Sequence, residues 1–325
     1  MTYCPLFSEE DFARLYIPRA RVEKVLRTAR GFARRTLQLR LAARSDVIVL
    51  YREAFPLGGP LFEQILAARR PLVFDFDDAI WLGDTSEFNA WIRRYKRPDK
   101  TADIVACSTI TTVGNDYLAA YSSRYSAAVR VLPTTIDVER YRPQPHEPRP
   151  RVRIGWSGSP TTSRYLIELA PVLREVLQRG DVELYVVGDP RFQLHGTPNV
   201  ISRPWSRHSE VADVSAFDIG IMPMPDDPWT RGKCGFKALL YMSFGVPAIA
   251  SPVGVNSSII QHGRNGLLAS STDEWARALH ALIDSAELRR RLGTNGRETV
   301  ISGYSGQQWA PQFYEILCEA AARGA

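Results

Sequence analysis

Short apolar runs alternate with amphipathic stretches along most of the chain, and this alternation is typical of βαβ units in a parallel sheet. In the first half it predicts strands at Asp46–Tyr51, Pro71–Phe74, Asp103–Ala106 and Val129–Leu132, and helices at Leu61–Arg69 and Asn115–Tyr121. In the second half it predicts strands at Arg153–Trp156, Val182–Val187, Phe217–Met222 and Pro247–Ser251, and helices at Tyr165–Gln178, Asp273–Asp284 and Ala286–Val300. The sequence therefore predicts an α/β protein with two similar halves.

A proline-rich stretch separates the two halves. The segment Tyr141–Arg151 contains four prolines and no hydrophobic periodicity, which is typical of a linker. We therefore expect an N-terminal domain over residues 1–143, a linker over 144–151 and a C-terminal domain that begins at residue 152.

A long amphipathic helix is expected over residues 19–44. Its apolar positions recur at spacings of three and four, with arginines between them: Val22, Leu26, Ala29, Ala33, Leu37 and Leu41. The pattern predicts a domain helix with a basic face. That face is either solvated or meets anionic lipid headgroups or a phosphorylated acceptor. No aromatic platform or nucleic-acid-binding motif accompanies the charge, so we expect no nucleic-acid partner.

Composition changes this picture little. The 325 residues are 45% hydrophobic and 23% charged, and the net charge is +6. Between Arg14 and Arg44 lie ten basic residues and one acidic residue, so this segment carries +9 and the remainder about −3.

The four cysteines show no CxxC spacing, which favours a reducing compartment without zinc or disulfides. The uncharged window Ala238–Val255 is broken by Gly245 and Pro247, so we expect no transmembrane segment and a cytoplasmic protein.

Candidate chemistry is concentrated in Arg231–Pro252, which predicts a turn, a short helix and a buried strand. Lys233 and Lys237 lie where that helix begins, and a helix N-terminus beside cations suits a phosphate group. The glycine-containing loop Gly155–Pro160 follows a strand and lets backbone N–H groups approach a diphosphate. In the first half, the acids of Asp75-Phe76-Asp77-Asp78 end a strand, where open α/β sheets place their ligands.

Several of these stretches resemble group 1 glycosyltransferases of the GT-B fold. The similar stretches are LYREAFPLGGPLFEQIL, PLVFDFDDAIW, VRVLPTTIDVERYRP, Gly155–Pro160, Phe217–Asn256 and HGRNGLLA. The resemblance implies two Rossmann-like domains that face a cleft, with a final segment over residues 304–325 that crosses from the C-terminal domain (152–303) back to the first. It also implies a nucleotide-diphosphate sugar as donor, a glycan or lipid-linked acceptor, retention of anomeric configuration and no metal or other cofactor. The basic helix then suggests work at the inner membrane face in surface polysaccharide or glycolipid assembly.

The resemblance also assigns residues. Lys237, with Asp77 or Asp78 in place of the histidine of many relatives, would be catalytic, and the donor would be bound by Gly158, Ser159, Thr161, Arg231, Lys233, Leu240, Gly254, Val255 and Asn256. Two departures accompany this assignment. Gly232 and Leu240 occupy the places of two glutamates, the second of which holds the ribose in the family. The first βα unit of the acceptor domain is also missing before Pro5.

Three alternatives remain open from the sequence. Asp75 and Asp77 match the first motif of haloacid-dehalogenase phosphatases, where they would act as nucleophile and acid/base with Mg²⁺. The same Asp-x-Asp pair is typical of the metal clamp of GT-A glycosyltransferases. Leu240 and the short N-terminal domain also fit a catalytically degenerate partner subunit.

Overall fold

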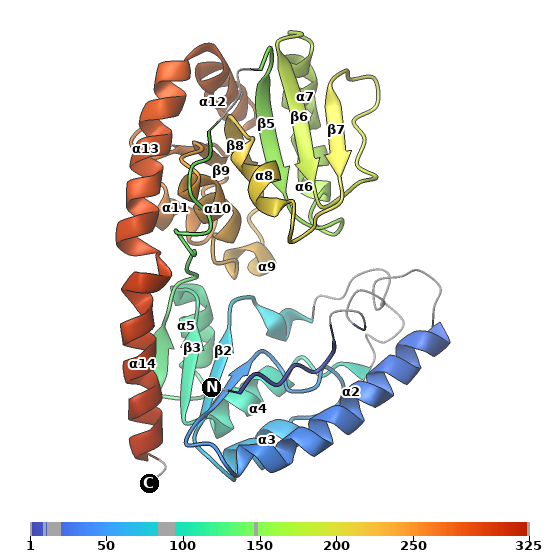
Figure 1. Ribbon diagram of the computed structural model, residues 1–325, viewed down its shortest axis with the longest axis vertical. Coiled ribbons are helices and arrows are strands. Elements are labelled where there is room, and N and C mark those ends of the chain that lie inside the picture. The colour runs from blue at the N-terminus through green and yellow to red at the C-terminus, as the bar shows by residue number, and fades with distance from the viewer. Residues whose placement is uncertain (1, 9–10, 12–20, 84–94, 146–148, 324–325) are drawn as a thin grey trace. The chain divides into compact units, whose positions relative to one another are not determined.

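The computed structural model describes residues 2–8, 11, 21–83, 95–145 and 149–323 (Figure 1). Contacts divide the chain into two compact units, of which the first contains Met1–Leu132 with Gln312–Ala325 and the second contains Pro133–Pro311. Each unit has its own sheet, and every strand pair in both sheets is parallel. The prediction of an α/β fold with parallel sheets is therefore confirmed.

The first unit contains a four-stranded sheet with the order β1-β2-β3-β4. Its strands are β1 (Ile48–Tyr51), β2 (Leu72–Phe76), β3 (Ile110–Val113) and β4 (Val129–Val131). Its helices are α2 (Arg21–Ala42), α3 (Leu61–Ala67), the 3-10 helix η1 (Ile80–Leu82), α4 (Lys100–Cys107) and α5 (Asp116–Ser122). The C-terminal part of α14 (Gly306–Arg323) belongs to this unit, because Ile316 and Ala320 pack on Val73 and Ile110.

The second unit contains a six-stranded sheet with the order β10-β9-β8-β5-β6-β7. Its strands are β5 (Val152–Ser157), β6 (Val182–Val187), β7 (Val200–Arg203), β8 (Ile219–Met222), β9 (Ala248–Ala250) and β10 (Leu267–Leu268). Its helices are α6 (Arg164–Glu168), α7 (Ala170–Leu177), α8 (Glu210–Ser215), α9 (Pro228–Arg231), α10 (Phe236–Ser243), α11 (Asn256–Ile259), α12 (Thr272–Asp284) and α13 (Ala286–Gly303). This is the Rossmann order, and its direction reverses between β5 and β8.

One predicted strand is wrong. Residues Asp103–Ala106 lie inside helix α4, and the strand of this region is β3, a few residues later. The apolar run in this segment is short, and Ile104 and Val105 are both fully buried. Such a run has no periodicity that distinguishes a buried strand from a buried helix. The predicted helix Tyr165–Gln178 is divided into α6 and α7, with a proline in the first turn of α7. Strand β7 was not predicted.

The amphipathic helix forms as predicted, as α2, but its apolar repeat does not face the core. All six positions of its apolar repeat are exposed in α2: Val22, Leu26, Ala29, Ala33, Leu37 and Leu41. The helix packs instead through its other side, where Gly31, Leu39 and Ala42 are buried. A Cβ at Gly31 would lie 2.9 Å from the ring of Phe7, so this glycine lets the N-terminal segment pass close to the helix.

The boundary between the units differs from the one expected. Residues 133–143 belong to the second unit, because Ile136 pairs with Ser305 and Val138 packs in the same apolar cluster as Phe244. Part of the expected linker, residues 146–148, lies outside the described residues.

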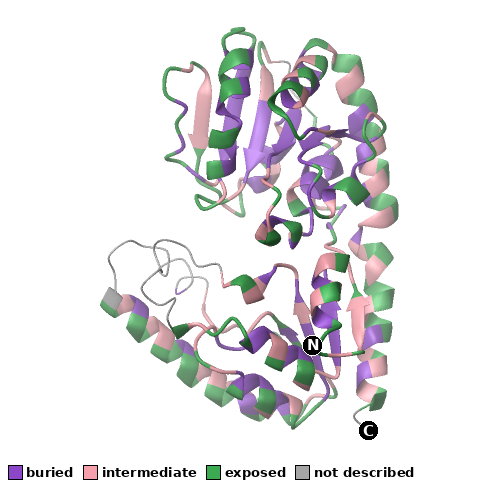
Figure 2. Cartoon of the chain, turned by 180° about the vertical axis from the view of Figure 1, so that it is seen from behind, coloured by how far each residue is buried: buried purple, intermediate pink, exposed green. Residues whose placement is uncertain are grey.

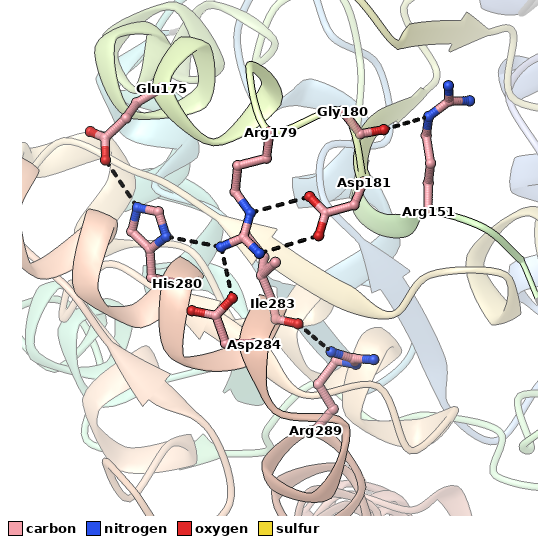
Figure 3. Close-up of polar contacts among 9 residues, drawn as sticks. All are labelled: Arg151, Glu175, Arg179, Gly180, Asp181, His280, Ile283, Asp284 and Arg289. Atoms are coloured by element: carbon pink, nitrogen blue, oxygen red, sulfur yellow. Dashed lines mark hydrogen bonds and ion pairs between the residues drawn. The ribbon is translucent and has the colours of Figure 1, made fainter.

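A polar network fixes α7 to α12 (Figure 3). Arg179 donates to Asp181 and pairs with Asp284 at 2.7 Å, and His280 Nε2 lies 2.9 Å from Glu175 Oε1. Asp181 immediately precedes β6, so the network lies at the amino end of the strands. Ligands of such sheets bind at the carboxyl ends, so we assign this network to the fold rather than to a site.

Candidate functional site

Loops after three neighbouring strands of the second unit approach one another at the carboxyl ends of β5, β8 and β9. A Cβ at Gly158, after β5, would lie 2.9 Å from Lys237 Nζ on α10. A Cβ at Gly254, after β9, would lie 2.9 Å from the carbonyl oxygen of Arg231, in the segment after β8. Since β5 and β8 flank the point where strand order reverses, this is where a doubly wound sheet binds a ligand.

The loop after β5 is held in place by buried contacts. The backbone N–H of Ser157 donates to the hydroxyl of Tyr241, a fully buried residue of α10, at 2.9 Å. Gly158 donates to the carbonyl of Val187 and lies against Gly188, where a Cβ would collide with the carbonyl oxygen of Gly158. Ser159 and Thr161 are exposed at the tip, with their hydroxyl oxygens 2.7 Å apart. Two predicted binding residues therefore face solvent on a rigid base.

Lys237 is partly buried at the second residue of α10. Its ammonium nitrogen lies 4.6 Å from the centroid of the buried Trp156 ring, a cation–π distance. Burial, and then the charge of Lys233, lower the pKa of Lys237 to about 7. Because burial and the charge of Lys233 disfavour the ammonium form of Lys237, an anionic ligand at this place would stabilise that form.

Lys233 and Arg231 lie in the segment between β8 and α10. Lys233 Nζ lies 4.7 Å from the centroid of the Trp229 ring, and Arg231 forms an exposed ion pair with Asp226 at 2.6 Å. Asp227 caps α9 by accepting from the backbone N–H of Thr230 at 2.8 Å. The cap fixes the turn that carries both basic side chains.

Two predicted binding residues are placed differently from the expectation. Leu240 is 1% exposed and packs in the core cluster beside Leu239, so its side chain faces the core. Asn256 is fully buried, and its amide nitrogen donates to the carbonyl of Ser251 at 3.0 Å. The Asn256 side chain therefore fixes the loop after β9. Gly254 and Val255 form the more accessible part of that loop.

In the first unit, the predicted acids belong to an ionic cluster at the carboxyl ends of β1 and β2. Arg52 pairs with Asp78 and, at 2.8 Å, with Asp77, and the Tyr51 hydroxyl also donates to Asp77 at 2.8 Å. Arg52 has a φ of 56°, a left-handed conformation that a residue with a side chain adopts only at a cost. Neither Tyr51 nor Arg52 is among the site residues predicted from the sequence, although Tyr51 ends a predicted strand and Arg52 directly follows it.

Asp75 is an interior residue of β2. Its carboxylate accepts from the Thr112 hydroxyl at 2.6 Å. Burial raises the pKa of Asp75 to about 6, the Thr112 bond opposes this, and the charge of Asp77 adds to it. A phosphatase or GT-A site would need Asp75 and Asp77 to share an ion. Here each is bound to protein partners of its own.

The described residues contain neither a candidate metal-binding cluster nor a candidate membrane-spanning helix. No group of three or more histidine, cysteine, aspartate or glutamate side chains there is placed to hold a metal ion. No helix there is long and apolar enough to span a bilayer.

Comparisons with known proteins agree with this geometry. Residues 153–285, which include the three loops, match the model of the family Glycosyl transferases group 1. A stretch of 165 residues is 26% identical to N-acetyl-alpha-D-glucosaminyl L-malate synthase of Bacillus anthracis, covering 46% of this chain and 42% of that protein. The match thus spans less than half of the curated relative.

Solved structures show the fold of the whole chain. Sucrose-phosphate synthase from Thermosynechococcus elongatus has a TM-score of 0.68 at 17% identity, covering 95% of this chain and 81% of that one. HepE from Anabaena, solved with UDP and glucose, has a TM-score of 0.67 at 16% identity, covering 88% and 81%. The chain therefore has the fold of GT-B glycosyltransferases, and residues 153–285 of its second unit match the group 1 family model.

Proposed function

We propose that the chain transfers a sugar from a nucleotide-diphosphate sugar to a glycan or lipid-linked acceptor, with retention of anomeric configuration. The observation that carries the proposal is the approach of Lys237 to the glycine loop after β5, within the segment that matches the group 1 family. The diphosphate would lie against the Gly158 loop and the two lysines. Those charges and backbone N–H groups would stabilise the negative charge of the leaving group without a metal.

Roles on the acceptor side follow from the ionic cluster of the first unit. Asp77 is half-exposed, and its ion pair with Arg52 fixes the position of its carboxylate. We infer that Asp77 or Asp78 faces the reacting sugar. Attachment to an anionic membrane through the basic residues between Arg21 and Arg44 would bring the enzyme to a lipid-linked acceptor. This role suits surface polysaccharide or glycolipid assembly.

A thermal-shift screen with UDP, GDP, ADP and their sugars tests the donor site. UDP is the first choice, because HepE was solved with UDP and with UDP-glucose. We expect one nucleotide diphosphate to raise the melting temperature. Transfer should persist in EDTA, and the anomeric configuration of the product, measured by proton NMR, should match that of the donor. No shift with any nucleotide would contradict the proposal.

A second candidate is a catalytically degenerate GT-B partner subunit. Leu240 favours it, since a buried leucine cannot accept hydrogen bonds from a ribose. The same screen separates the two candidates when it is combined with a donor-hydrolysis assay. Nucleotide binding without hydrolysis or transfer would favour the degenerate subunit.

A further inference from the structure

Helix α2 presents an apolar stripe to solvent, and Figure 2 shows exposed residues recurring along the length of this helix. The exposed fractions are 75% for Val22, 57% for Leu26, 64% for Leu37 and 44% for Leu41. The small residues Ala29 and Ala33 continue the stripe between them. At 1.5 Å per residue it runs for about 28 Å, which is long for an exposed aliphatic surface on a monomer.

The stripe faces outward because the other side of α2 is fixed to the first unit. Arg35 Nε donates to the carbonyl of Ala54 at 2.9 Å, and Gln38 donates to the carbonyl of Pro5 at 3.1 Å. The carbonyl of Leu39 accepts from Arg69 at 2.6 Å. These bonds attach one side of α2 to the first unit, and among the described residues the aliphatic stripe on the other side remains exposed.

Exposed arginines accompany the stripe. Arg30 lies four residues after Leu26, Arg40 lies three after Leu37, and Arg44 lies three after Leu41. On a helix such spacings place the guanidinium groups of Arg30 and Arg40 beside the preceding leucines. Arg44 lies in the turn that follows the end of α2 at Ala42. Arg27, in contrast, is bound within the unit by Asp11 and Glu23.

We propose that α2 lies in the surface of an anionic membrane, with its aliphatic stripe inserted at the boundary of headgroups and acyl chains. Arg30, Arg40 and Arg44 bind lipid phosphates beside it. An interfacial helix has this composition, with aliphatic residues on one side and basic residues next to them. Attachment therefore has an insertion component as well as an electrostatic one. This inference deepens the membrane attachment that forms part of the proposed function and rests on it, although binding to lipid needs neither donor nor acceptor.

Charge favours lipid over a second copy of the chain. Helix α2 contains seven basic residues and one acidic residue, a net charge of +6. Two copies in contact through their stripes would bring two such helices together in a low-dielectric interface, where like charges repel. Anionic lipid offers an apolar layer and neutralising phosphates in one surface.

The test is co-sedimentation of the full chain with phosphatidylcholine vesicles, with and without phosphatidylglycerol. We expect binding that requires phosphatidylglycerol. The Leu26→Asp/Leu37→Asp variant should weaken it by at least about tenfold, since two inserted aliphatic side chains are lost. The matched control is Ile301→Asp, an exposed apolar residue of the second unit, which should bind like the wild type. Charge reversal at Arg30, Arg40 and Arg44 should also weaken binding.

Salt and association state separate the outcomes. Binding of the wild type that partly survives high salt supports insertion, whereas complete release by salt overturns it. Equal binding by the Leu26→Asp/Leu37→Asp variant overturns it too, as does a dimer in sedimentation velocity that this variant abolishes, or capture by an acidic protein in place of vesicles. Unchanged melting and nucleotide response of the variant show that fold and donor site are intact, so a failure here is distinct from a failure of the proposed function.

Discussion

The carboxyl ends of the two sheets handle charge in opposite ways. In the second unit the ammonium of Lys237 lies over an indole ring, and burial and then the charge of Lys233 lower its pKa. In the first unit Arg52 sits between Asp77 and Asp78 and neutralises much of their charge. A site with excess positive charge suits an anionic ligand such as a diphosphate. A neutralised cluster with oriented oxygens suits the hydroxyl groups of a sugar.

Removing the Lys237 charge should give the largest effect. The Lys237→Ala variant loses stabilisation of the departing diphosphate, so kcat/KM should fall by about 100-fold or more. Steady-state transfer with the nucleotide sugar found in the screen measures it. Lys237→Arg restores a charge and should recover part of the loss. Unchanged donor affinity and turnover in Lys237→Ala would show that the comparison assigns the donor to the wrong place.

Changes in the ionic cluster should affect the acceptor and spare the donor. In Arg52→Gln the two aspartates lose their cationic partner, so their orientation is relaxed and the KM for acceptor should rise by about tenfold. The dissociation constant of the nucleotide, measured by calorimetry, should stay at the wild-type value. Asp77→Asn tests the same cluster with less change of shape. A parallel loss of nucleotide affinity in both variants would remove the distinction between the two sites.

The pH dependence of nucleotide binding sharpens the comparison further. The pKa of Lys237 is about 7 in the free protein, whereas a bound diphosphate favours the ammonium form. Binding above pH 7 must then take up a proton, so affinity should fall by about fivefold between pH 7 and pH 8. Calorimetry in buffers of different ionisation enthalpy measures the proton uptake. The Lys237→Met variant should bind weakly with no such dependence, and an equal slope in that variant would implicate another group.

The sequence predicted the elements that have a regular period or a sharp boundary. Strands β5 and β6, helix α12 and the turn before α10 all lie close to their predicted positions. The pattern of α2 predicted a helix correctly but not which side packs, because amphipathicity defines two faces without naming the partner of either. Asp103–Ala106 failed because a buried helix and a buried strand have the same short apolar run.

The candidate site was predicted in part. Glycines and lysines near a helix start are visible in sequence, so Gly158, Lys233 and Lys237 could be chosen before the structure. The cation–π contact of Lys237 with Trp156 joins residues that are far apart in the chain, so no spacing rule predicts it. The burial of Leu240 and Asn256 likewise depends on tertiary packing.

The smallest expected effect is on thermal stability. Removing the charge of Lys237 should raise the melting temperature, although it should lower the transferase activity. The pKa of Lys237 is about 7 in the folded protein and has an ordinary value near 10.5 when the chain unfolds. The unfolded state therefore binds more protons between these values, so stability rises with pH across that window and the penalty is complete below pH 7. Lys237→Met removes the partly buried charge and nearly keeps the length of the side chain. Its melting temperature should exceed that of the wild type by about 3 °C at pH 6, for a gain of about 1 kcal/mol, and by less toward pH 10.

Scanning calorimetry at both pH values measures the difference in melting temperature. Arg290→Met, an exposed change in the same unit, is the control and should show no such trend. A variant that melts below the wild type at pH 6 would mean that Lys237 is stabilised in the free protein, and the contrast between the two sheet ends would then disappear.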